Sequence, residues 1–306
     1  MSAPFKPFLN LTFAAVAGLC FAYQAPPQIK PTPKLFKVTV ETVFVSVSVT
    51  DPYGRYVTGL EKENFKIFED QVQQEILHFG QKAAPISVGL IFDVSRSMGD
   101  NYNIRKAKNA ITGFLKEGSE EDEYFLVTFN QRSTLVQSFT RSSETVQNEV
   151  AVQKPGGSTA LYDAVYMGLD YVKRGTNEKK AIILITDGED NSSRYSPSEV
   201  REFAKELNVQ VYGIGLEGLL GYGGTVIQNI ISITGGRSFR PSNFNELDYY
   251  IGLIHAELRS QYVLGYGPTN QVHDGKWRRI RVKMDELPGM PKLIIHAREG
   301  YYAPKT

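Results

Sequence analysis

The amino-acid sequence predicts an α/β protein: a doubly wound, mostly parallel sheet, with a sandwich-like β domain built from the two flanks of the chain. The run Ile86–Phe92 is uncharged and rich in β-branched and aromatic residues, as in a strand buried on both faces. After it, strand patterns alternate with segments of helical length, which is typical of a parallel sheet covered by helices. The flanks alternate apolar and polar residues instead and contain no helical pattern.

The central part supplies the elements of the sheet in order. Strands are expected at 86–92, 124–130, 134–140, 181–186 and 209–215, where apolar residues run together. Helices are expected at 102–115, 142–153, 161–173, 196–207, 226–233 and 245–259. The clearest helix start is Ser196, because Ser-Pro-Ser-Glu combines a capping box with proline in the first turn.

The flanks predict a single β domain. Residues 37–51 alternate with period two and end in the turn Asp51–Gly54, and β patterns return at 262–268, 276–284 and 292–303. About fifty residues on each side are too few for two independent sandwiches, so the flanks are expected to pair. The expected boundaries are a signal peptide at 1–22, a proline-rich linker at 23–35, β segments at 36–84 and 260–306, and the α/β domain at 85–259.

The first residues predict export. Lys6 precedes an apolar stretch, Phe8–Ala22, which is typical of a signal peptide and short for a membrane span. Cleavage after Ala22 would leave no cysteine and no membrane span, and the protein would be periplasmic or secreted. A lipoprotein anchor at Cys20 is disfavoured because Leu19 precedes it. An uncleaved anchor is the third alternative.

The composition does not point to a particular class of partner. The chain has 34 basic and 33 acidic residues and a formal charge of +1, which gives no electrostatic footprint for nucleic acid. The densest basic run, Lys276–Lys283, alternates along a predicted strand. Such a pattern usually marks a solvated face, and binding of an acidic partner or glycan is the alternative.

Oxygen-bearing side chains gather where the buried strands are expected to end. Asp93, Ser95 and Ser97 alternate directly after the first of these strands, Thr159 follows two glycines in the loop 155–161, and Asp187 ends a second strand. Carboxyl ends of neighbouring parallel strands share one edge of a sheet, where ligands bind. Carboxylates and hydroxyls suit Mg²⁺, Mn²⁺ or Ca²⁺. Capping of the helix that follows is the other explanation for Asp93 and Ser95.

Three segments carry a family resemblance: DVSRS at 93–97, GGSTALYDAV at 156–165 and ITDGED at 185–190. In this order they resemble the metal-binding loops of the von Willebrand factor A (VWA) domain, a Rossmann-like fold with a metal-ion-dependent adhesion site, over about residues 85–259. The resemblance implies a divalent cation, with Mg²⁺ favoured, held directly by Ser95, Ser97 and Thr159. It implies that Asp93 and Asp187 act mostly through water, and that a partner protein's Asp or Glu carboxylate takes an open position.

The flanks, 47–80 and 258–284, are further similar to those of exported VWA-related proteins of Acidobacteria. We therefore expect an exported binding module for adhesion, and no enzymatic turnover. Two alternatives stay open. The ion could be structural, with binding left to the β domain, or Asp93 could be the nucleophile of a Mg²⁺-dependent phosphohydrolase.

One motif competes with the metal site for a function. Gly213–Gly218 satisfies the GxGxxG pattern after a strand, but no clear helix follows it, so a loop beside the sheet is preferred to a dinucleotide site.

Overall fold

The computed structural model describes residues 42–81, 84–99, 101–187, 190–215 and 225–305. Every described residue belongs to one compact unit, 40–306. The expected signal peptide and proline-rich linker, with Cys20 and Ala22, lie outside the described residues. Within the described ranges, no helix combines the length and the apolar character needed to cross a membrane.

The central sheet has six strands in the order β10-β9-β8-β5-β6-β7. Their bounds are β5 Ile86–Asp93, β6 Glu123–Phe129, β7 Ser133–Thr140, β8 Lys179–Thr186, β9 Gln210–Gly215 and β10 Ser238–Phe239. All neighbours are parallel except β6 and β7, which are antiparallel. The sheet is therefore mostly parallel, and the expected α/β class is confirmed.

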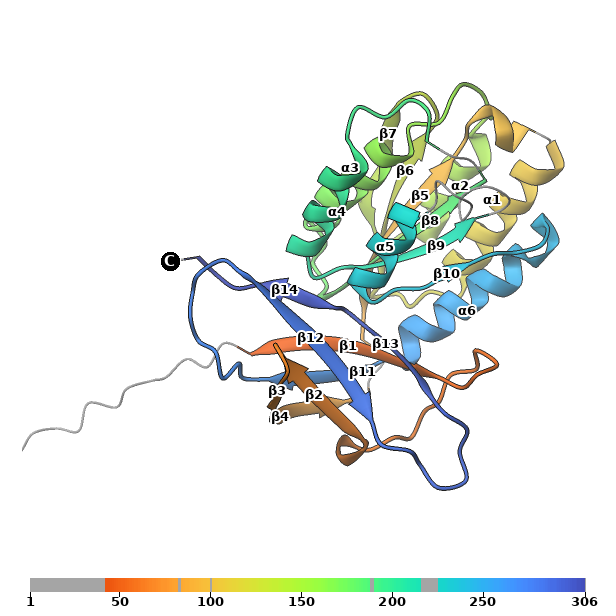
Figure 1. Ribbon diagram of the computed structural model, residues 1–306. Helices are drawn as coiled ribbons and strands as arrows, with labels where there is room; N and C mark the ends of the chain where they lie inside the picture. Colours follow the sequence, from red (N-terminus) through yellow and green to blue (C-terminus); the bar gives the residue numbers. More distant parts are fainter. Residues whose placement is uncertain (1–41, 82–83, 100, 188–189, 216–224, 306) are drawn as a thin grey trace, which may run out of the picture. The chain divides into compact units, whose positions relative to one another are not determined.

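Helices cover both faces of this sheet (Figure 1). One face carries α1 Asn101–Lys116, α2 Ser143–Val152 and α6 Leu247–Ser260, and the other carries α3 Leu161–Val172, α4 Pro197–Glu206 and α5 Thr225–Thr234. Every residue of β5 is buried, because Leu90 and Phe92 pack under the first set and Ile91 under the second. A strand that is buried on both faces along its whole length lies in the middle of such a sheet.

The two flanks form the β module, which consists of two four-stranded antiparallel sheets. Its strands are β1 Val43–Thr50, β2 Phe65–Glu69, β3 Val72–Gln74, β4 Ile76–Gly80, β11 Tyr262–Tyr266, β12 Trp277–Met284, β13 Ile294–Ala297 and β14 Gly300–Tyr302. The sheet orders are β13-β1-β11-β4 and β14-β12-β2-β3, so each sheet takes strands from both flanks. Apolar side chains such as Val47, Ile67 and Leu264 form their shared core.

The last β segment differs from the expectation. Residues 292–303 form two strands in different sheets, which separate at Arg298 and Glu299. The main chain of Glu299 is held from two sides: its C=O accepts from Ile280 N at 2.8 Å, and its N–H donates to Ile233 O at 3.1 Å. This crossing point cannot be inferred from an alternation of apolar and polar residues. The two-residue strand β10 is likewise too short to give a pattern.

A buried carboxylate joins the α/β part to the β module. Glu257 of α6 is 0% exposed and accepts hydrogen bonds from Tyr56 Oη at 2.9 Å and Tyr212 Oη at 3.1 Å. Arg237 Nη1 lies 3.3 Å from the same carboxylate. Burial raises the pKa of Glu257, and Arg237 opposes that rise. Nearby, Gln261 Nε2 donates to Ser48 Oγ of the β module at 3.2 Å.

We expect Glu257→Ala to lower the free energy of unfolding by about 3–5 kcal/mol, because the Arg237 guanidinium and two tyrosine hydroxyls would lose their shared acceptor. Urea denaturation followed by far-ultraviolet circular dichroism measures the loss. Glu206→Ala, at the exposed end of α4, is the matched control and should change stability by less than about 0.5 kcal/mol. Equal losses in the two variants would contradict a special role for the buried carboxylate.

Candidate functional site

The candidate site lies at the carboxyl ends of β5 and β8, which are adjacent parallel strands in the middle of the sheet. Asp93 is the last residue of β5, and Asp187 follows the last residue of β8. Phe92 pairs with Ile185, so Asp93 stands opposite Thr186. The strand register therefore brings two loops, distant in sequence, to one edge.

Four of the five predicted ligands form a continuous row of hydrogen bonds. Asp93 Oδ1 accepts from Ser95 N at 2.7 Å, and the Ser95 and Ser97 hydroxyl oxygens lie 2.9 Å apart. Ser97 Oγ donates to Asp187 Oδ1 at 2.8 Å. Asp93 and Ser95 are 0% and 1% exposed, whereas Ser97 is exposed and Asp187 is half-buried. The row thus runs from the protein interior to its surface.

Thr159, the fifth predicted ligand, is 4% exposed and reaches this edge on a separate loop. Main-chain hydrogen bonds fasten that loop to the first one: Gly156 N donates to Val94 O at 2.8 Å, and Arg96 N donates to Gly157 O at 3.0 Å. Gly157 has φ +87°, a left-handed conformation that favours glycine. This turn explains why glycine occupies the second position of the pair Gly156–Gly157.

Both carboxylates are held where ionisation is unfavourable. Burial raises the pKa of Asp93 to about 6, against the hydrogen bonds from Ser95 and Thr186. Burial also raises the pKa of Asp187, and the Ser97 hydroxyl opposes that rise. A divalent cation beside both groups would favour their charged forms.

The donor set consists of oxygen atoms only. Within the described residues, no group of three or more His, Cys, Asp or Glu side chains could hold a metal ion. A cation at this edge would therefore depend on the Ser and Thr hydroxyls as much as on the two carboxylates. Such a set fits a hard cation that keeps part of its water shell, as Mg²⁺ does.

The sequence pattern did not predict the role of three supporting residues. Thr186 Oγ1 donates to Asp93 Oδ2 at 2.6 Å, Asn191 Oδ1 accepts from Thr159 N at 2.8 Å, and Asp190 Oδ1 accepts from Leu161 N at 2.8 Å. Asp190 and Asn191 belong to the polar run after β8, which was the available signal. Their partners depend on how the loops meet.

Gly188 and Glu189, like the part of the GxGxxG pattern after Gly215, lie outside the described residues.

Asp190 caps a helix from a different loop. The residue before α3 is Ala160, whose side chain cannot accept a hydrogen bond from the helix. We expect Asp190→Ala to cost about 1 kcal/mol of stability, the usual effect of losing an N-cap. Chemical denaturation measures it. Asp170→Ala removes a half-buried carboxylate of α3 that pairs with Lys173, and it should cost less than about 0.5 kcal/mol. A comparable loss in both variants would refute the capping role.

Comparison with known proteins gives one curated relative, an uncharacterized protein of Borreliella burgdorferi. It is 27% identical over 142 residues, which cover 44% of this chain and 41% of the relative. The chain therefore spans less than half of that relative's length.

Several solved structures are similar. A von Willebrand factor type A protein from Catenulispora acidiphila matches with a TM-score of 0.53 and 11% identity, over 86% of this chain and 75% of the other. Proximal thread matrix protein 1 from the mussel byssus, with a zinc-occupied MIDAS motif, matches with a TM-score of 0.50 and 21% identity, over 62% and 49% of the two chains. The PilB minor pilin of Streptococcus sanguinis has a TM-score of 0.48 and 17% identity, over 58% and 62%.

A family model decides the assignment. The model of the von Willebrand factor type A domain matches residues 87–252, more than half of the chain, and this range includes the whole candidate site. The chain belongs to the von Willebrand factor type A domain family.

Proposed function

We propose that this protein binds a partner protein through a divalent cation held by Asp93, Ser95, Ser97, Thr159 and Asp187. VWA domains are protein-interaction modules, and this chain has that domain. The row of hydrogen-bonded oxygens from Asp93 to Asp187 carries the proposal, because it gathers hard ligands from two strands at one partly exposed edge. The bound ion would supply the attraction for a carboxylate of the partner.

The exposure of the row supports recognition over a purely structural ion. Asp93 and Ser95 form the buried end, and Ser97 forms the exposed end, so an ion beside the hydroxyls would face the surroundings on one side. An acidic side chain of a partner could then approach it. A structural ion, with binding left to the β module, remains the second candidate.

Phosphoryl transfer fits less well. A nucleophilic aspartate needs an oxygen open to the substrate, but Asp93 is 0% exposed and both of its carboxylate oxygens accept hydrogen bonds. Its surroundings favour an orienting role. We therefore propose a binding protein rather than an enzyme.

The resident ion is proposed to be Mg²⁺, with Mn²⁺ and Ca²⁺ as alternatives, because the ligands are carboxylates and hydroxyls. The zinc-occupied MIDAS motif of the mussel protein makes Zn²⁺ a necessary comparison. We also propose that the protein is exported, as its first 22 residues predict, and that residues 85–259 form the VWA domain.

Calorimetric titration with Mg²⁺, Mn²⁺, Ca²⁺ and Zn²⁺ tests the site. We expect saturable binding of one ion to the wild-type protein, at least tenfold weaker in Asp93→Ala and in Thr159→Ala, because each variant removes one proposed ligand. Asp170→Ala should bind as the wild type does. Circular dichroism must show that the variants are folded. Absence of saturable binding to the wild type would contradict the proposed ion site.

Removing the ion distinguishes a role in partner recognition from a purely structural role. If the ion bridges to a partner, affinity for that partner falls at least tenfold in EDTA and in the folded Asp93→Ala variant, as measured by surface plasmon resonance. A structural ion predicts a lower melting temperature in EDTA with unchanged affinity, because binding to the folded state stabilises it by mass action.

A further inference from the structure

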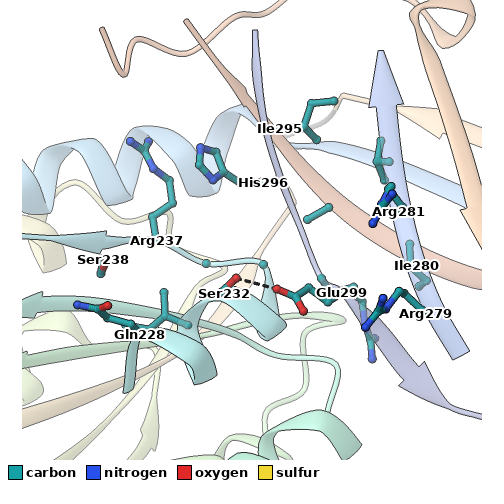
Figure 2. A pocket seen from close by; sticks show the side chains of 16 residues that line it. Gln228, Ser232, Arg237, Ser238, Arg279, Ile280, Arg281, Ile295, His296 and Glu299 are labelled. Carbon is teal, nitrogen blue, oxygen red and sulfur yellow. Dashed lines mark hydrogen bonds between the residues drawn. The ribbon is translucent and has the colours of Figure 1, made fainter. Parts of the chain in front are cut away.

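A second candidate site lies far from the metal-binding edge, at the junction of the VWA domain and the β module. A cavity of about 790 Å³ opens there. Three stretches line it: the segment from α5 to β10, residues 279–282 of β12, and residues 295–299, which include most of β13 (Figure 2). Gly236 packs against the main chain of Val211, near the beginning of β9, which places this segment at the opposite edge of the sheet from Asp93 and Asp187.

The cavity runs along strand edges. Side chains of a strand alternate between its two faces, so a cavity over one face contacts every second residue. Here four consecutive residues of β12 and five consecutive residues at 295–299 line the wall. Of the described strands, only β1 pairs with β13. β12 pairs with β2 along one edge; along its other edge β14 pairs at Trp277–Arg279 and Ile280 N donates to Glu299 O, so the unpaired part begins after Ile280. Unpaired strand edges are templates for an additional extended chain.

Arginine dominates the lining. Arg237, Arg279, Arg281 and Arg298 all border the cavity, and Glu299 is the one acidic residue among the described residues that line it. Glu299 accepts from Ser232 Oγ at 2.8 Å, as the dashed line in Figure 2 shows. Burial and the nearby Arg237 lower the pKa of His296 to about 4, so this histidine is neutral at pH 7.

Most of this positive charge has no internal counterion. Arg237 pairs with Glu257. Among the described residues, Arg298 donates only to neutral oxygens, those of Gly300 at 2.8 Å and Asn208 at 2.9 Å. Arg279 and Arg281 are exposed, and neither forms an ion pair with a carboxylate of the described residues. Because the whole chain carries only +1, the excess is a local property of this cavity.

The floor of the cavity is fixed in place. Gly235, with φ +80°, lies so close to the main chain at Ala297 and Arg298 that an added Cβ would stand 2.4 Å from Arg298 N. The hydrogen bonds of Glu299 to Ile233 and Ser232 hold the same contact. A preformed wall lowers the entropic cost of binding.

We propose that this cavity binds an extended acidic peptide of a partner protein. Its main chain would add to the open edge of β12 after Ile280 or of β13 before Ala297, and its carboxylates would meet Arg279, Arg281 and Arg298. Peptide addition to a strand edge gives affinity through the main chain, and guanidinium groups pair with carboxylates through two parallel hydrogen bonds. The proposal needs no ion and does not rest on the proposed function of the metal site.

The residues of the basic run Lys276–Lys283 differ in their position relative to the cavity. Arg279 and Arg281 line the cavity, whereas Lys283 Nζ lies 4.9 Å from the ring centroid of Phe68 and is not part of the lining. Lys283 is exposed on the same strand, so it provides a matched control.

Fluorescence anisotropy of the full chain in EDTA tests the proposal with a fluorescein-labelled hexapeptide, Val-Glu-Val-Glu-Val-Glu. We expect saturable binding, at least tenfold weaker for the Val-Gln analogue and for the double variant Arg279→Gln/Arg281→Gln. Lys283→Gln should bind within twofold of the wild type. A backbone N-methylated peptide should also bind at least tenfold more weakly, because it cannot donate hydrogen bonds to a strand edge.

Four results would overturn the proposal: no binding of the acidic peptide, equal binding of the neutral analogue, unchanged binding to the folded double variant, or unchanged binding of the N-methylated peptide. Pyrophosphate is titrated in parallel. If pyrophosphate binds with the same arginine dependence and the peptide does not, the cavity holds small phosphate-bearing ions and the peptide proposal is wrong. All of these measurements are made in EDTA, so their results do not depend on whether the proposed metal site binds an ion.

Discussion

The candidate metal site depends on a charge placed at the end of a buried strand. β5 lies in the middle of the sheet with every residue buried, and it ends in Asp93, which is 0% exposed. Burying a carboxylate is costly unless it is paired or hydrogen-bonded. The Ser95 main chain and the Thr186 hydroxyl offset part of that cost. The surrounding loops add more hydroxyls and a second carboxylate. A cation bound among these oxygens would stabilise the charged forms of both carboxylates.

Much of this arrangement could be predicted from the sequence. The apolar run before Asp93 indicates a central strand, and polar side chains after such strands indicate a ligand-binding edge. The roles of Thr186 and Asp190 could not be predicted in this way. Thr186 supports Asp93 because of the register between β5 and β8, and Asp190 caps α3 from a loop distant in sequence. Periodicity along one segment contains no information about register or loop contacts.

The β module shows the same limit. Alternation in the flanks predicted strands, and the shortness of each flank predicted that they would pair. The separation of β13 from β14 depends on the main chain of Glu299, which is held by Ile280 and Ile233 at once. The cavity beside it is likewise a product of tertiary structure: Arg237 joins Arg279 and Arg281 there, although more than forty residues of sequence lie between them. The basic run alone gave no reason to expect a strand edge.

The insertion of the VWA domain into the β module has a consequence for the order of folding. Val43 of β1 pairs with Tyr266 of β11, more than two hundred residues later, so the module has a high contact order. During synthesis, β1–β4 emerge long before the strands they require. Folding of the inserted domain brings Gly80 and Val263 together, which shortens the loop that the module must close. A substitution that slows folding of the VWA domain therefore also prolongs the time for which these early strand edges are open to association with other chains.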